Sequence, residues 1–480
     1  MTDLLNRAYD PEAFRDAGHA LIDLLAKHLQ NLQEHTLPTM PWMTPDDQMD
    51  YWKNYELGDQ PSSKLFQDIL DRSINVHHPQ FMGHQIAPAA PMAALANLVS
   101  GLIANGMAIY EMGPASTAIE QIVCQQIAQK FGLGPDSDGI LTSGGTLANL
   151  TALLTARAVK APAKVWNDGH ADRLAVMVCE EAHYCIDRAA RIMGLGSKGI
   201  IKIPATADFR MDTDQLEHHL AKANEKNLYV IAVIGSAPST STGTYDDLKA
   251  IGQFCQQHDL WFHVDGAHGG AAIYSEKYKH LLDGVELADS IAIDGHKMMM
   301  TPSIMTFLLF KDKRTGYQTF SQKAQYLWAD AEEAEWHNLA KRTFECTKEM
   351  MSIKFFALQQ VYGDQLFADF VTNQYDLGQV FAAQVQSHPN MELAHQPDSN
   401  IVCFRVTNPT LSPRELDQLN AQIRAEILSD GQFYIVQTTL HDRTWLRVSL
   451  MNPMTDSTLI AKLLKRVEYW SQKALITSDK

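Results

Sequence analysis

Short apolar runs alternate with helical segments through the middle of the chain, and this alternation limits the possible folds more than any other feature. The apolar runs lie at 174–179, 228–236, 260–265 and 290–294, and the helical segments at 186–193, 212–224 and 245–258. A continuous apolar run of this length is typical of a strand buried on both faces, as in a parallel sheet covered by helices. The sequence therefore predicts an α/β fold with a mostly parallel sheet between layers of helices.

The two ends of the chain differ from this central region. In the first 62 residues, Asp10 can cap a helix that starts at Pro11, and apolar residues recur at helical spacing from Phe14 to Leu29. Such an arm buries little by itself and should pack on the rest of the protein or on a second subunit. After residue 346, predicted strands (400–406, 433–440, 444–450) mix with predicted helices (413–428, 455–470). We therefore predict a helical arm at 1–62, a large domain at 63–345 and a small α+β domain at 346–480.

Composition excludes several classes of protein. Of the 480 residues, 45% are hydrophobic and 20% are charged, which is typical of globular proteins and not of disordered chains. The apolar runs are too short to span a membrane, the start of the chain has no signal pattern, and a net charge of −16 disfavours nucleic acid and anionic membranes. The six cysteines are scattered without a CxxC pair. We therefore expect free thiols, no metal centre and a cytoplasmic enzyme.

Two predicted strands end in residues that can carry chemistry. Asp265 ends a strand in HVDGAHGG (263–270), where a carboxylate either binds a cationic group or caps the next helix. Lys297 follows a strand in DGHKMMM (294–300), beside His296. In an apolar pocket its amine would be held neutral and nucleophilic, and otherwise it is a surface lysine.

Two further segments follow predicted strands. In GILTSGGT, residues 143–146 lead into a helix whose exposed N–H groups could bind an anion, although Gly-Gly is often only a turn. His183 lies between a strand and a helix in EEAHYCIDRAARIMGLG (180–196), and a lone histidine is more often structural than functional. Together the four segments match the needs of pyridoxal phosphate, which binds a lysine through its aldehyde, an acid through its ring nitrogen and a helix start through its phosphate.

With these motifs at their spacing, the chain resembles the pyridoxal-phosphate-dependent group II amino acid decarboxylases. This family includes glutamate, cysteine sulfinate, 2,4-diaminobutyrate and aromatic amino acid decarboxylases. The resemblance extends from His78-Pro79 to Asn452-Pro453 and rests on HVDGAHGG, DGHK and EEAHYCIDRAARIMGLG. It implies an aspartate-aminotransferase-like fold (fold type I), with a mostly parallel seven-stranded sheet in the large domain and a small C-terminal α+β domain.

The resemblance also implies roles around the cofactor. Lys297 would bond to the cofactor aldehyde, Asp265 would pair with the pyridine nitrogen, and His183 would stack on the ring. The other implied cofactor residues are Ala267 beneath the ring, His296 before the lysine, Gly144, Gly145 and Thr146 at the phosphate, and Thr240 nearby.

Four more positions are matched to substrate chemistry. Tyr326, in QKAQYLWADAEEAEW, matches a mobile-loop tyrosine that would protonate the substrate carbon after carbon dioxide leaves, although it could be an ordinary packed aromatic. Together with His183 it favours decarboxylation over the oxidative, aldehyde-forming branch. Arg447, in WLRVSLMNP, matches the arginine that binds the substrate carboxylate, or else makes a structural ion pair. His84 and Gln85 would contribute to the side-chain pocket.

These pocket residues predict a polar substrate. His84 and Gln85 stand where aromatic-specific members have aromatic residues, so we expect glutamate, aspartate, cysteine sulfinate or 2,4-diaminobutyrate. The alternatives are a tyrosine-type aromatic amino acid decarboxylase, a transaminase or C–C lyase on the same fold, or a binding protein that has lost activity. The resemblance implies a homodimer with active sites at the interface and an exchanged N-terminal arm.

Overall fold

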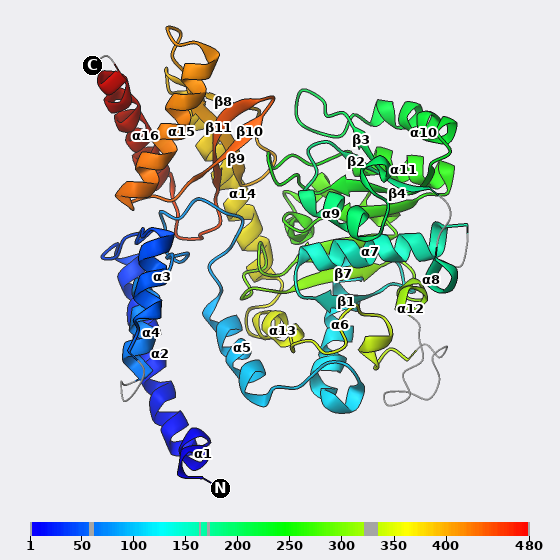
Figure 1. Cartoon of the computed structure of the whole chain (residues 1–480), viewed down its shortest axis with the longest axis horizontal. Coiled ribbons are helices and arrows are strands. Elements are labelled where there is room, and N and C mark those ends of the chain that lie inside the picture. Colours follow the sequence, from blue (N-terminus) through cyan, green and yellow to red (C-terminus); the bar gives the residue numbers. More distant parts are fainter. Residues whose placement is uncertain (1, 57–61, 163–164, 170–172, 321–334, 479–480) are drawn as a thin grey trace. The chain divides into compact units, whose positions relative to one another are not determined.

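The computed structural model describes residues 2–56, 62–162, 165–169, 173–320 and 335–478 (Figure 1). Contacts between residues divide the chain into two compact units. The first comprises 1–84, 380–394 and 403–480, and the second comprises 85–379 and 395–402. The three-part division at residues 62 and 345 stays a prediction.

A seven-stranded sheet forms the centre of the second unit. Its strands are β1 (Asp138–Thr142), β2 (Leu174–Cys179), β3 (Ile200–Ile203), β4 (Tyr229–Ser236), β5 (Trp261–Asp265), β6 (Ser290–Asp294) and β7 (Thr306–Phe310). They are arranged in the order β1-β7-β6-β5-β4-β2-β3. Strand β7 runs antiparallel to both of its neighbours, and the other pairs are parallel. The predicted mostly parallel sheet and the fold type I assignment are therefore confirmed.

Helices cover this sheet because its strands are apolar on both faces. All five residues of β5 and of β6 are buried, which leaves neither face of these strands for water. Helix α7 (Gly145–Lys160) runs across the sheet in Figure 1 and contributes Ala148, Ala152 and Leu153 to the core. The other helices of the unit are α5 (Pro91–Ile103), α6 (Pro114–Lys130), α8 (Val165–Asp168), α9 (Tyr184–Ile192), α10 (Leu216–Glu225), α11 (Leu248–His258), α12 (Thr315–Phe320) and α13 (Ser352–Tyr362). Helix α14 (Gln365–Gln386) continues from the second unit into the first.

The predicted helix at 245–258 begins later than its sequence suggested. The segment 245–258 becomes helical at Leu248, because Asp247 caps the helix by accepting a hydrogen bond from the Ala250 N–H at 2.9 Å. The carboxylate of Asp246 instead accepts a hydrogen bond from the backbone N–H of Ser236 at 2.8 Å. This contact ties the loop before the helix to the end of β4.

The first unit contains an antiparallel sheet of order β10-β11-β9-β8. Its strands are β8 (Met391–Leu393), β9 (Ile401–Val406), β10 (Val436–Leu440) and β11 (Arg443–Ser449). Helices α15 (Pro413–Asp430) and α16 (Ser457–Ser478) follow β9 and β11 in the chain. Helices α1 (Asp3–Ala8), α2 (Pro11–Gln33), α3 (Pro45–Lys53) and α4 (Ser62–Asp71) form its N-terminal part. Helix α2 starts as predicted, with the Asp10 carboxylate accepting from the Glu12 N–H and with Pro11 as the first helical residue.

Two general properties of the chain concern its helices and its cysteines. Within the described residues, no helix is both long enough and apolar enough to cross a membrane. None of the six cysteines is in a disulfide, and five of them are buried.

Candidate active site

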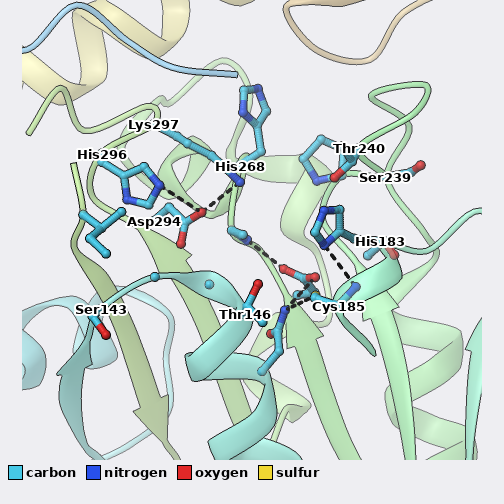
Figure 2. Close-up of a pocket in the computed structure, with 18 residues that line it drawn as sticks. Ser143, Thr146, His183, Cys185, Ser239, Thr240, His268, Asp294, His296 and Lys297 are labelled. Atoms are coloured by element: carbon cyan, nitrogen blue, oxygen red, sulfur yellow. Dashed lines mark hydrogen bonds and ion pairs between the residues drawn. The ribbon is translucent and has the colours of Figure 1, made fainter. Parts of the chain in front are cut away.

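The carboxyl ends of the parallel strands border one cavity of about 330 Å³ in the second unit (Figure 2). Ligands in α/β proteins bind at this edge of the sheet because the loops that follow the strands converge there. All of the predicted cofactor residues line the cavity: Gly144, Gly145, Thr146, His183, Thr240, Asp265, Ala267, His296 and Lys297. In Figure 2, Thr146 lies below the cavity, His183 and Thr240 lie to one side, and His296 lies on the other.

The loop between β1 and α7 has backbone features that suit an anion. Gly144 is the residue before the helix and has φ +115° and ψ 156°, a conformation that is essentially restricted to glycine. No side chain makes a capping hydrogen bond at this position, so no cap satisfies the first N–H groups of the helix. Because these N–H groups carry the positive end of the helix dipole, the loop suits a phosphate.

Asp265 is held in place by two hydrogen bonds. The Nδ2 of Asn149 donates to its Oδ2 at 2.9 Å, and the backbone N–H of Ala267 donates to its Oδ1 at 3.2 Å. The residue is 9% exposed. A carboxylate held in this position can accept a hydrogen bond from a cationic ring nitrogen.

A chain of hydrogen bonds continues behind Asn149 into the core. The Oδ1 of Asn149 lies 2.8 Å from Nε2 of His263, whose Nδ1 lies 2.9 Å from the hydroxyl of Ser290. The indole N–H of Trp261 donates to the same hydroxyl at 2.9 Å. Complete burial lowers the pKa of His263 to about 4, so the ring is neutral. In this form one ring nitrogen donates a hydrogen bond and the other accepts one, so both nitrogens take part in the chain of hydrogen bonds.

Lys297 makes an ion pair with Asp294, the last residue of β6. Its Nζ lies 2.8 Å from Oδ2 of Asp294, and the Thr306 hydroxyl donates to Oδ1 of the same carboxylate at 2.5 Å. Burial acts to lower the pKa of Lys297, but the charges of Asp294 and Asp265 outweigh it and raise that pKa. The expected neutral amine in an apolar pocket is therefore wrong for this form of the protein, because a carboxylate three residues earlier holds the proton on the lysine.

His183 reaches the cavity from the start of α9. Its Nδ1 accepts a hydrogen bond from the Cys185 N–H at 3.4 Å, which caps the helix. Burial lowers the pKa of His183, and Lys297 lowers it further against the opposing effect of Asp265. A neutral, flat ring at this wall can cover the face of an aromatic ligand.

Two of the predicted substrate residues lie together in the first unit. Arg447 is on β11 and is 6% exposed, and burial lowers the pKa of its guanidinium. Burial also lowers the pKa of His84, and the positive charges of Arg447 and Arg424 lower it further. Arg424, on α15, donates a hydrogen bond to the hydroxyl of Tyr434, whose ring centre lies 5.7 Å from that of His84. The sequence did not indicate Arg424.

The remaining two predictions have different outcomes. Gln85 belongs to the second unit, and its buried Nε2 has no acceptor among the described residues. Tyr326 lies in 321–334, outside the described residues, so its role stays a prediction. No cluster of three or more His, Cys, Asp or Glu side chains in the described part of the chain is arranged to hold a metal ion.

Comparison with known proteins identifies the family. The model of the pyridoxal-dependent decarboxylase conserved domain matches residues 56–407. The chain belongs to this decarboxylase family.

Relatives differ in the substrates that their names state. An L-aspartate decarboxylase of Metarhizium robertsii is 30% identical over 346 residues, covering 72% of this chain and 69% of the relative. An aromatic-L-amino-acid decarboxylase of Bacillus atrophaeus is 23% identical and covers 98% of each chain. The solved glutamate decarboxylase domain of the diaminobutyrate-pyruvate transaminase and L-2,4-diaminobutyrate decarboxylase from Vibrio parahaemolyticus has a TM-score of 0.84 at 26% identity, and covers 98% of this chain and 97% of that one.

The chain is thus a pyridoxal phosphate-dependent amino acid decarboxylase, and its cavity fits that cofactor. An uncapped helix start faces the cavity for the phosphate, a supported carboxylate for the ring nitrogen, and a lysine amine for the aldehyde. These three groups come from α7, β5 and the turn after β6.

Sequence reasoning missed three residues of the site: Asn149, His263 and Asp294. His263 and Asp265 are two residues apart on one strand and therefore share a face, which could have indicated their connection. Asn149 lies four residues after Gly145 on α7 and so reaches the cavity from the same side of the helix. Asp294 was visible beside Lys297 in DGHK, but only the fold shows that the two side chains pair.

Proposed function

We propose that this enzyme decarboxylates an L-amino acid with an acidic side chain, with Lys297, His183 and Tyr326 as its catalytic residues. Glutamate, aspartate and cysteine sulfinate are the candidate substrates, and 2,4-diaminobutyrate is a weaker candidate. The proposal rests mainly on Arg424, which acts on His84 in the first unit in addition to Arg447. A second anionic group on the substrate would be attracted to this cluster, whereas the ammonium group of 2,4-diaminobutyrate would be repelled.

Bound pyridoxal phosphate would supply the electron sink for the bond that breaks at the substrate carbon. The chain would supply the rest. Asp265 would pair with the pyridine nitrogen and keep a proton on it, because Asn149 and the Ala267 N–H hold its carboxylate in place. The first N–H groups of α7 would hold the phosphate, and His183 would cover the ring. Ala267, His296 and Thr240 complete the cofactor cavity.

Arg447 would bind and orient the substrate. A guanidinium can hold a carboxylate through two parallel hydrogen bonds, which fixes the direction of the bond that must break. Its burial on β11 strengthens this attraction because little water screens it. Tyr326 would then donate a proton to the substrate carbon after carbon dioxide leaves. His84 and Gln85 would form part of the side-chain pocket.

Release of carbon dioxide from single amino acids, with added pyridoxal phosphate, tests this proposal. The panel contains glutamate, aspartate, cysteine sulfinate, 2,4-diaminobutyrate and tyrosine. We expect release from one acidic amino acid, and a KM for that substrate that rises about tenfold or more in Arg424→Gln, since one charge-assisted contact is lost. Release from tyrosine alone would retain the reaction and refute the acidic pocket. A keto acid or an aldehyde as the product, without the amine, would indicate a transaminase or a lyase.

We also propose that the enzyme is a cytoplasmic homodimer whose active sites lie at the interface. Exposed apolar side chains on two helices support the proposal of a second subunit. Phe14, Ile22 and Leu25 of α2 are 36–50% exposed, and Leu98 and Leu102 of α5 are 47% and 63% exposed. Exposed apolar side chains at helical spacing are typical of a covered face. Six cysteines without a disulfide fit a reducing compartment. A monomeric mass in solution at micromolar concentration would contradict the dimer.

A further inference from the structure

Asp294 places a carboxylate directly against the proposed phosphate site. A Cβ atom added to Gly145, the first residue of α7, would lie 3.0 Å from Oδ1 and 3.3 Å from Oδ2 of Asp294. The Asp294 side chain is only 3% exposed, so little water screens its charge. Figure 2 shows Asp294 between His296 and the loop that begins at Ser143.

The surroundings contain little positive charge to offset an incoming phosphate. Among the described residues that line the cavity, Lys297 is the one lysine or arginine, and it is already paired with Asp294. Asp265 adds a second carboxylate. On the other side of the loop, the Ser143 hydroxyl donates a hydrogen bond to Glu345. The start of α7 supplies only a partial positive charge.

A phosphate monoester carries close to two negative charges at pH 7, because its second pKa is about 6. Bound at the start of α7, it would lie next to the Asp294 carboxylate in a largely buried site. Two anions this close repel each other strongly unless one of them takes up a proton. A hydroxyl of the protonated group can then donate a hydrogen bond to the other.

We propose that Asp294 couples cofactor binding to the uptake of one proton, which is shared between its carboxyl group and the cofactor phosphate. This inference rests on the proposed assignment of the residue 144–146 loop to the phosphate. It predicts that the enzyme holds its cofactor less tightly as the pH rises above the second pKa of the phosphate. The proton is taken up because the phosphate arrives, so it is not needed in the cofactor-free form, where Lys297 neutralises Asp294.

The other titratable groups that face Asp294 come from three elements. Lys297 and His296 follow it in the chain, with Nε2 of His296 at 3.7 Å from its Oδ2. His183 and Cys185 act on it from α9, and Asp265 lies at the end of the neighbouring strand β5. Burial lowers the pKa of His183 and raises that of Cys185, so both groups stay neutral near pH 7. We place the proton on Asp294 or on the phosphate, because these are the two anions that would face each other.

Calorimetric titration of the cofactor-free full-length chain with inorganic phosphate, in two buffers that differ in ionisation enthalpy, measures the protons taken up at the phosphate site without the bond to Lys297. At pH 8 we expect Asp294→Asn to take up about one proton fewer than the wild type. Glu345→Gln is the matched control, because it removes the other carboxylate at the loop, and we expect its proton count to equal that of the wild type. Equal counts in the wild type and Asp294→Asn, or a loss in Glu345→Gln alone, would overturn the inference.

Inorganic phosphate, used as a competitor of the cofactor, separates the phosphate site from the bond at Lys297. In the wild type, phosphate should compete about tenfold more weakly for each pH unit above its own second pKa, since one proton is bound with it. In Asp294→Asn, phosphate should compete about tenfold or more strongly at pH 8, and this gain should vanish towards pH 5. The same competition in both proteins at every pH would refute the role of Asp294 while leaving the cofactor site intact. If the wild type does not bind pyridoxal phosphate at all, the proposed function fails together with this inference.

Discussion

Acid should destabilise the protein through His263, because this histidine is folded into the core in its neutral form. Burial lowers its pKa to about 4, whereas an exposed histidine in the unfolded chain has a pKa of about 6.5. Between these two values the unfolded chain binds a proton that the folded protein does not. The contribution is therefore fully favourable above pH 6.5 and is lost as the pH falls towards 4.

The size of the effect follows from the two pKa values. At pH 5 the unfolded histidine is almost entirely protonated and the folded one is mostly neutral, which corresponds to about 2 kcal/mol relative to pH 7. His263→Gln removes the titration but can keep a donor for Oδ1 of Asn149, which lies 2.8 Å from the present ring nitrogen. Other acid-sensitive groups, such as His78, are present in both proteins and cancel in the difference.

Urea unfolding of the cofactor-free protein, at pH 7 and at pH 5, measures this difference. The wild type should lose about 2 kcal/mol more than His263→Gln between the two pH values. Equal losses in both proteins would show that His263 is protonated in the folded state. That result would refute the direction of the hydrogen-bond chain from Trp261 to Asp265, which requires a neutral ring.

Three further substitutions test separate parts of the structure. Asn149→Ala removes the side-chain donor to Asp265 and should weaken the affinity for pyridoxal phosphate about tenfold or more, as measured by calorimetry. Gly144→Ala places a side chain at φ +115° and should cost about 1–3 kcal/mol, seen as a lower urea midpoint together with weaker cofactor binding. Asp138→Asn leaves the buried guanidinium of Arg342 without its carboxylate and should destabilise the protein by about 3–5 kcal/mol in urea unfolding. An unchanged midpoint for Asp138→Asn would show that the Arg342 charge has another sufficient partner.

The strands of the central sheet could be predicted because they are buried on both faces. The runs 174–179 and 290–294 are strands over the same residues that their apolar character indicated. Element ends were less predictable where a polar side chain had a tertiary partner. Asp246 could have started a helix, but its carboxylate accepts backbone hydrogen bonds from Ser236 and Met211 instead.

The sequence could indicate those residues of the cavity that end a strand or directly follow one. Lys297, Asp265 and His183 each follow or end a strand of the same sheet, and strand ends converge in a parallel sheet. The state of the lysine was not predictable, because it depends on the distance between two side chains. Asp294 pairs with it at 2.8 Å and raises its pKa, which reverses the effect expected from burial.

Lys297 as the attachment point of the cofactor is the central claim, and reduction with borohydride tests it most directly. The chain is loaded with pyridoxal phosphate, reduced, digested and mapped by mass spectrometry, with Lys297→Ala as the control. We predict that the cofactor is fixed on the peptide that contains DGHKMMM, at Lys297, and that this labelled peptide is missing from the control. Label spread over surface lysines, or an unmodified Lys297 in a protein that still releases carbon dioxide, would contradict the account.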